Sequence, residues 1–82
     1  MAKIVLPYVL ARSFAEGVSE HQVQAVDPRQ LVHALDERFP GIGERLNDGF
    51  AIAIDGEIFQ DWFLECIGPE SEVYFIPAIE GG

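Results

Sequence analysis

The stretch from Asp27 to Gly41 has the sequence DPRQLVHALDERFPG and contains the start, body and end of one helix. Asp27 is a residue type that caps helices, Pro28 suits the first helical position, and Gln30 stands where the return half of a capping box belongs. Apolar residues recur at helical spacing and predict one buried face, made of Leu31, Val32, Leu35 and Phe39. Pro40-Gly41 then ends the helix.

Two strand patterns precede this helix. Residues 3–10 (KIVLPYVL) are rich in β-branched and aromatic residues, with Pro7 among them. Residues 20–26 (EHQVQAV) alternate polar and apolar side chains, as a half-buried strand does. A polar, glycine-containing connection at residues 13–19 lies between them. The two stretches therefore predict a β-hairpin.

Further strand patterns follow the helix, after an expected loop with a short turn at residues 41–48. Residues 50–54 and 57–59 flank Asp55-Gly56, a dipeptide typical of tight hairpin turns. Residues 60–71 are expected to be irregular. Residues 72–78 (EVYFIPA) form the last predicted strand, and Pro77 ends its regular pairing.

The order strand, strand, helix, strand, short strand, strand predicts an α+β fold. One main helix can cover only one face of the sheet, so the smallest consistent architecture is a mixed sheet of four to five strands gripping that helix, the ubiquitin-like β-grasp. No repeat or linker interrupts the pattern. We therefore expect one domain over residues 1–82, with a flexible tail at residues 77–82.

Alternation along each strand predicts which side chains face the helix. The inward set is Ile4, Leu6, Val23, Ala25, Ile52, Ile54, Val73 and Phe75. The helix-free face is then expected to carry an apolar set where a monomer normally places polar residues: Val5, Pro7, Ala51, Ala53, Tyr74 and Ile76. Scattered apolar residues are common on protein surfaces, but a contiguous patch marks a partner surface. We therefore predict that this face binds a partner protein.

Composition narrows the class of function. The chain has 82 residues, of which 49% are hydrophobic and 23% charged, a globular profile. No apolar run approaches the roughly 20 residues of a membrane span. The N-terminus lacks a secretory pattern and Cys66 is the single cysteine, so a reducing cytoplasmic location is expected. So short a chain favours a carrier or binding module over a self-sufficient enzyme.

Charge is distributed unevenly along the sequence. The net charge is −9, which disfavours nucleic acid as a partner. Residues 1–45 hold all five bases and six acids, whereas residues 46–82 hold eight acids and no base. This imbalance serves solubility, or it steers the second half of the chain toward a basic partner.

No catalytic or metal-binding set is predicted. His21, His33 and Cys66 stand apart in sequence, and we expect Cys66 to be a small core residue. Gly41-Ile42-Gly43 follows a helix and lacks the downstream Lys-Ser/Thr of a phosphate loop, so it is expected to be a turn. Trp62-Phe63 is expected to close the core under a long loop, with a binding anchor as the alternative.

The end of the chain carries the remaining signal: residues 75–82 have the sequence FIPAIEGG. A terminal carboxylate is ionised at neutral pH, because its pKa is roughly 3.3–3.7. It can attack the α-phosphate of ATP only if the backbone threads a narrow channel, and glycine has no Cβ to clash there. Gly81-Gly82 after the last strand therefore favours a chain that presents its main-chain carboxylate for chemistry.

Three stretches together resemble the bacterial ubiquitin-like sulfur carriers, the family of the molybdopterin synthase small subunit, the thiamine-pathway carrier and the carriers that feed cysteine synthesis. They are Arg38-Phe39-Pro40-Gly41, Asp55-Gly56-Glu57 and the final twelve residues, SEVYFIPAIEGG. The last stretch is the specific one. Pro69-Glu70-Ser71 departs from the Gly-Asp pair of the family, and Pro7-Tyr8 from the consecutive aromatics of molybdopterin subunits. Both departures weaken an assignment to molybdenum cofactor biosynthesis.

The resemblance implies that this chain is a carrier without catalytic residues, or the small subunit of a complex such as molybdopterin synthase. Gly82 would be adenylated and converted to a thiocarboxylate that supplies molybdopterin, thiamine, cysteine or tRNA thiolation. The tail that enters the partner would be Pro77, Ala78, Ile79, Glu80 and Gly81. The implied partners are an adenylating enzyme that uses ATP, a sulfurtransferase and a sulfur-accepting enzyme, with no metal or tightly bound cofactor.

Two alternatives remain open from sequence. The same tail would serve a ubiquitin-like modifier conjugated to lysines. It would also serve a non-catalytic binding or regulatory module whose tail docks in a partner's active site.

Overall fold

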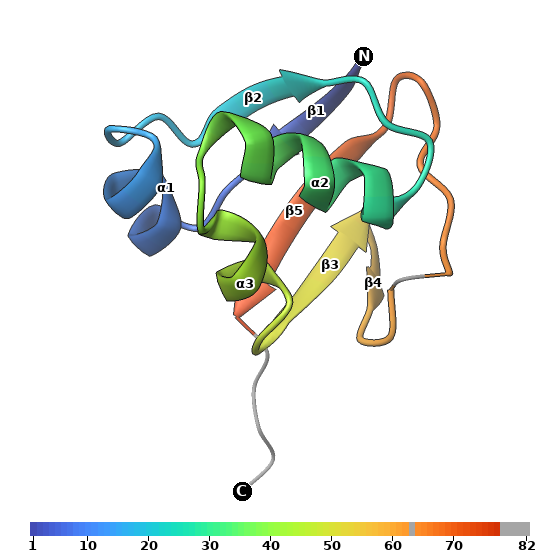
Figure 1. Cartoon of the computed structure of the whole chain (residues 1–82). Coiled ribbons are helices and arrows are strands. Elements are labelled where there is room, and N and C mark those ends of the chain that lie inside the picture. Colours follow the sequence, from blue (N-terminus) through green and yellow to red (C-terminus); the bar gives the residue numbers. More distant parts are fainter. Residues whose placement is uncertain (63, 78–82) are drawn as a thin grey trace, which may run out of the picture.

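The structure is a computed structural model that describes residues 1–62 and 64–77. Within these residues the chain forms one five-stranded sheet and three helices (Figure 1). The elements in chain order are β1 (Ala2–Val5), α1 (Tyr8–Phe14), β2 (Glu20–Val23), α2 (Pro28–Arg38), α3 (Ile42–Leu46), β3 (Phe50–Ile54), β4 (Glu57–Phe59) and β5 (Glu72–Pro77). The mixture of sheet and helix confirms the α+β prediction.

The sheet has the order β2-β1-β5-β3-β4, so the first and last strands of the chain are neighbours at its middle. β1 and β5 are parallel, with Val5 opposite Tyr74, and the other neighbouring pairs are antiparallel. Figure 1 shows α2 lying across one face of this mixed sheet, with α1 and α3 at its margins. The arrangement matches the predicted sheet that grips one main helix.

The core lies between α2 and the sheet. Asp27 Oδ1 accepts a hydrogen bond from the Gln30 backbone N–H at 2.8 Å, which starts α2 as the sequence predicts. Leu31 and Leu35 of its apolar face are fully buried. The residues predicted to point inward from the strands are also all buried: Ile4, Leu6, Val23, Ala25, Ile52, Ile54, Val73 and Phe75. Strand alternation therefore identified the buried side of the sheet.

The prediction of a strand over residues 3–10 is wrong beyond Val5, because Tyr8–Phe14 is helix α1. Pro7 has an extended backbone and caps this helix, and its carbonyl accepts hydrogen bonds from the Leu10 and Ala11 amides. Leu10 and Ala11 are fully buried, so tertiary packing outweighs the strand propensity of Tyr8 and Val9. β1 and β2 still pair as predicted, but a helix occupies much of their connection.

Two other boundaries differ from prediction, and the end of the last strand falls at the edge of the described residues. The expected loop at residues 41–48 contains α3, which buries Ile42 and Leu46 completely. β2 ends at Val23 rather than residue 26. β5 is described to Pro77, and the predicted end at Ala78 lies outside the described residues.

Candidate partner-binding face

The predicted tail begins where the described chain stops. Pro77 is exposed and lies opposite Phe50 at the last paired position of β5. Ala78, Ile79, Glu80, Gly81 and Gly82, which the sequence predicts to enter the partner, lie outside the described residues. Their roles therefore stay predictions. The structure does place the start of the tail, at the end of a central strand (Figure 1).

Register brings the predicted apolar residues together on the face away from α2. Ala53 lies opposite Tyr74, which lies opposite Val5, so one row crosses β3, β5 and β1. Ala51 lies opposite Ile76 in the next row on the same side of the sheet. Pro7 does not belong to these rows, because it follows β1 as the half-buried cap of α1.

Ile58 was not among the residues predicted for this face, but it extends the first row across β4. Ile58 lies opposite Ala53, and 63% of its side chain is exposed. The signal was present in the sequence, because a two-residue turn at Asp55-Gly56 sets the register of the hairpin. Both turn residues have positive φ, at 50° and 87°, as a type I′ turn requires.

We call the set Val5, Ala51, Ala53, Ile58, Tyr74 and Ile76 the sheet-face patch. Its members differ in exposure: Ile58 and Tyr74 are exposed, Val5 and Ile76 are half-buried, and the two alanines are buried. The two alanines are therefore the recessed part of the patch, and its larger apolar side chains stand around them. That this face binds a partner protein stays a prediction.

The sheet face changes from polar to apolar along β5. At the start of β5, Lys3 lies opposite both Glu72 and Gln22, and its Nζ forms a 2.8 Å ion pair with Glu20. That pair is the main reason that the pKa of Lys3 is raised. Tyr74 and Ile76 follow toward the end of the strand. The apolar part of the face is therefore the part next to the start of the tail.

A carboxylate at the other end of β5 holds the loop that precedes this strand. Asp55 accepts hydrogen bonds from the Glu72 backbone N–H at 2.9 Å and from Ser71 Oγ at 2.8 Å. These two hydrogen bonds lower the pKa of Asp55, because both donors favour the charged carboxylate. Asp55 therefore has a structural role at the edge of the sheet.

The candidate reactive residues of the sequence do not come together. His21 Nε2 lies 2.7 Å from the Val18 carbonyl oxygen, and His33 pairs with Glu37 on the surface of α2. Cys66 is exposed, so its prediction as a core residue is wrong; the neighbouring Ile67 is the buried one, and its amide binds the Val26 carbonyl. Among the described residues, no three His, Cys, Asp or Glu side chains form a metal-binding group.

Trp62 belongs to the core, as predicted for the pair Trp62-Phe63. It is buried, its Nε1 donates to the Phe50 carbonyl oxygen at 2.9 Å, and its ring packs edge-on against Phe75. It is therefore no surface anchor. Phe63 lies outside the described residues.

None of the helices in the described part of the chain is long and apolar enough to cross a membrane.

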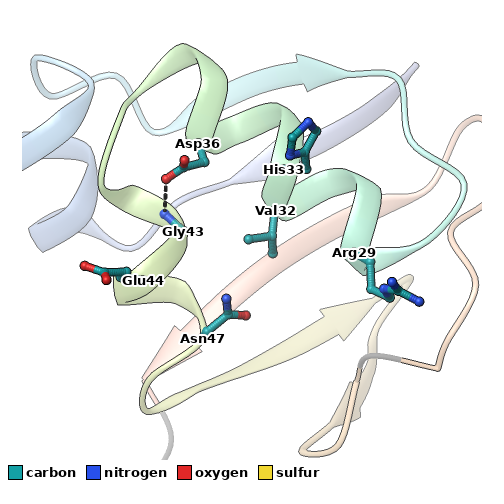
Figure 2. A pocket seen from close by; sticks show the side chains of 7 residues that line it. All are labelled: Arg29, Val32, His33, Asp36, Gly43, Glu44 and Asn47. Carbon is teal, nitrogen blue, oxygen red and sulfur yellow. Dashed lines mark hydrogen bonds between the residues drawn. The ribbon is translucent and has the colours of Figure 1, made fainter.

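A pocket with a polar lining lies between α2 and α3 (Figure 2). Arg29, His33 and Asp36 line its α2 side, and Glu44 and Asn47 its α3 side. Asp36 is already engaged, because its Oδ1 accepts from the Gly41 and Gly43 amides at 3.1 and 2.9 Å. This carboxylate joins the two helices, so the predicted turn at Gly41-Ile42-Gly43 is the capped start of α3.

Comparison with known proteins bears on the fold and the class of function. The ThiS family model matches residues 11–82 of this chain. The molybdopterin synthase sulfur carrier subunit of Pyrenophora tritici-repentis is 30% identical over 81 residues, which are 95% of this chain and 87% of that protein. The family match and the alignment with this relative therefore each cover most of the chain.

Two solved structures share the fold. A chain of the Amycolatopsis orientalis BexX/CysO complex has a TM-score of 0.84 at 17% identity, with all of both chains covered. Mycobacterium tuberculosis CysO has the same TM-score at 19% identity, over 96% of this chain and all of that one. The predicted β-grasp is thereby confirmed. With the family match and the curated relative, these observations show that the chain is a carrier rather than a catalyst and belongs to the ThiS family of ubiquitin-like sulfur carriers.

Proposed function

We propose that the chain carries sulfur on its C-terminal glycine. The Gly82 carboxylate attacks the α-phosphate of ATP in an activating enzyme, which forms an acyl-adenylate and releases pyrophosphate. Sulfide would displace AMP to leave the thiocarboxylate directly, whereas a protein persulfide would displace AMP to leave an acyl disulfide, which a thiol reductant then cleaves to the thiocarboxylate. The acceptor enzyme takes the sulfur for molybdopterin, thiamine or cysteine synthesis or for tRNA thiolation.

The observation that carries the proposal is the position of Pro77, the first residue of the predicted tail, beside the sheet-face patch. β5 contributes Tyr74 and Ile76 to the patch and leads directly to Pro77, the first residue of the tail. A partner that covers the patch therefore lies next to Pro77, which supports its access to the predicted tail. No catalytic side chain is needed from the carrier, because the partner supplies the nucleotide site and this chain supplies a main-chain carboxylate.

Intact mass after co-expression with the activating enzyme and a sulfur source tests the proposal. Conversion of –COOH to –COSH adds about 16 mass units, as sulfur replaces oxygen. We expect this species in the wild type and its loss when Gly82 is deleted or an extra residue follows it. A wild-type chain that keeps its original mass, while a known carrier is converted in the same assay, would contradict the proposal.

The same experiment distinguishes a sulfur carrier from the alternative, a protein modifier. A modifier would appear as larger conjugates that vanish with Gly82, whereas a sulfur carrier keeps its own mass plus the thiocarboxylate increment. A purely regulatory tail would keep full function after Gly82→Ala. We expect that variant to lose sulfur transfer, since a Cβ at the reacting residue clashes with a narrow channel.

A further inference from the structure

A second apolar surface lies beside β4, apart from the sheet-face patch. Leu64 is 91% exposed, the highest value among the large hydrophobic residues of the described chain. It lines a groove of about 450 Å³ together with Ile54 and Phe59. We call this hollow the β4 groove. Covering so exposed a leucine with a partner surface is favourable, because it removes apolar surface from water.

The charge around the β4 groove has one sign. Glu57 and Glu65 line it beside Leu64, and neither forms an ion pair with another described residue. All the residues that line the groove belong to residues 46–82, which contain no Lys or Arg. The charge that this part of the chain presents at the groove is therefore negative throughout. An apolar centre with an acidic rim fits a basic protein surface that presents an apolar socket.

The β4 groove leaves the start of the tail uncovered. Ile54 and Asp55 at the groove lie at the Val73 end of β5, whereas Phe50 pairs with Pro77 at the other end. The two ends are four residue steps apart along β3, which is about 13 Å. Glu57 and Phe59 also alternate with Ile58, so they point to the opposite side of β4 from the sheet-face patch.

We propose that the β4 groove docks the protein that delivers sulfur while the activating enzyme holds the tail. This inference rests on the proposed function. The adenylated end is enclosed by the activating enzyme, so the protein that delivers sulfur needs a binding surface elsewhere on the carrier. The β4 groove supplies that binding surface. Leu64 packs into an apolar pocket of the partner, and Glu57 and Glu65 form ion pairs with its basic residues.

The rate of thiocarboxylate formation tests the assignment with two sulfur sources. Both reactions contain the activating enzyme and ATP. One also receives sodium sulfide, and the other receives the cognate persulfide-bearing sulfurtransferase with a thiol reductant that cleaves the acyl disulfide. The groove variant is Glu57→Lys/Leu64→Ser/Glu65→Lys. The matched control, Glu16→Lys/Val18→Ser/Glu44→Lys, makes the same charge change at exposed residues away from β4. Circular dichroism checks that both variants fold.

With limiting sulfurtransferase, we expect the groove variant to lose about tenfold or more in rate, and the wild-type rate to fall with added salt. With sulfide, the wild type and both variants should react alike. Equal rates for the groove variant and the control under sulfurtransferase would overturn the docking site. Loss of the sulfide reaction in the groove variant would also overturn it, because the surface would then serve activation. No thiocarboxylate from the wild type with sulfide contradicts the proposed function itself.

Cys66 provides a direct measure of where the partner sits. It is the single cysteine of the chain, it is exposed, and it lines the β4 groove. We expect a sulfurtransferase with its reactive cysteine changed to serine to slow maleimide labelling of Cys66 about fivefold or more, and 0.5 M salt to reverse that protection. Unchanged labelling at saturating sulfurtransferase would overturn the assignment.

Discussion

At the scale of single residues, Asp55 links the β3–β4 turn to the start of β5. Its carboxylate accepts hydrogen bonds from Glu72 and Ser71, and the pKa of Asp55 is lowered for that reason. A group whose pKa is lower in the folded state stabilises the fold above its unfolded pKa. The contribution is then lost as the pH falls through the folded value.

The first prediction concerns the variant Asp55→Asn, which keeps the shape of the side chain and tolerates the positive φ. We expect its Tm to be below that of the wild type at pH 7. The difference should shrink as the pH falls below 3.8, the ordinary pKa of Asp. Thermal unfolding from pH 7 to 2 measures both curves. Asp61→Asn, at an exposed loop position, should show no such convergence, and a pH-independent difference for Asp55→Asn would contradict the assignment.

Gly43 lies where the Asp36 side chain contacts the first turn of α3. A Cβ at this residue would lie 3.0 Å from Asp36 Oδ1, the atom that accepts the Gly43 amide. The second prediction is that Gly43→Ala destabilises the fold by about 1–3 kcal/mol, because the carboxylate must shift and weaken its two hydrogen bonds. Urea unfolding measures the loss. Glu44→Ala, on the neighbouring exposed position of α3, should change stability by less than about 0.5 kcal/mol.

At the scale of elements, α2 is stabilised at its start by side chains the sequence identifies. Asp27 accepts from the Gln30 amide, while Gln30 Oε1 accepts from the Val26 amide at 3.3 Å rather than from Asp27. The third prediction is that Asp27→Ala costs about 1 kcal/mol, measured by chemical denaturation. Asp27→Asn keeps the oxygen and should recover most of that loss; equal losses in the two variants would contradict the capping role.

The elements differ in how far sequence alone predicts them. α2 was predictable because Asp27-Pro28 and Pro40-Gly41 mark its ends locally. α1 was not, since Tyr8 and Val9 favour strand and only the burial of Leu10 and Ala11 against the sheet selects helix. α3 depends on Asp36, a residue of the preceding helix, which no local pattern reveals.

The residues of the candidate site also differ in how far the sequence alone predicts them. The rows of the sheet-face patch followed from strand alternation, and Ile58 could have been found from the Asp55-Gly56 turn. The burial of Ala51 and Ala53 could not, because it depends on the larger side chains of neighbouring strands. Leu64 carries no pattern at all, since its exposure is a property of the irregular loop in which it lies.

At the scale of the whole molecule, the change from polar to apolar along the sheet predicts where a partner binds. The fourth prediction is that Tyr74→Ser raises the KM of the activating enzyme for the carrier about tenfold, because it removes the central aromatic side chain of the patch. ATP–pyrophosphate exchange measures this. Since Tyr74 is 40% exposed, stability should fall by no more than about 1 kcal/mol. Gln22→Ser, at the polar end of the same face, should leave KM within about twofold, and an equal effect there would contradict a localised contact.

The place of β5 in the sheet has a consequence for synthesis on the ribosome. β5 hydrogen bonds to both β1 and β3, so without residues 72–77 the β1–β2 and β3–β4 pairs have no common strand. A two-stranded ribbon is marginally stable in water. A nascent chain therefore closes its sheet only when β5 has emerged from the ribosome, and a product that stops before residue 72 lacks a folded body.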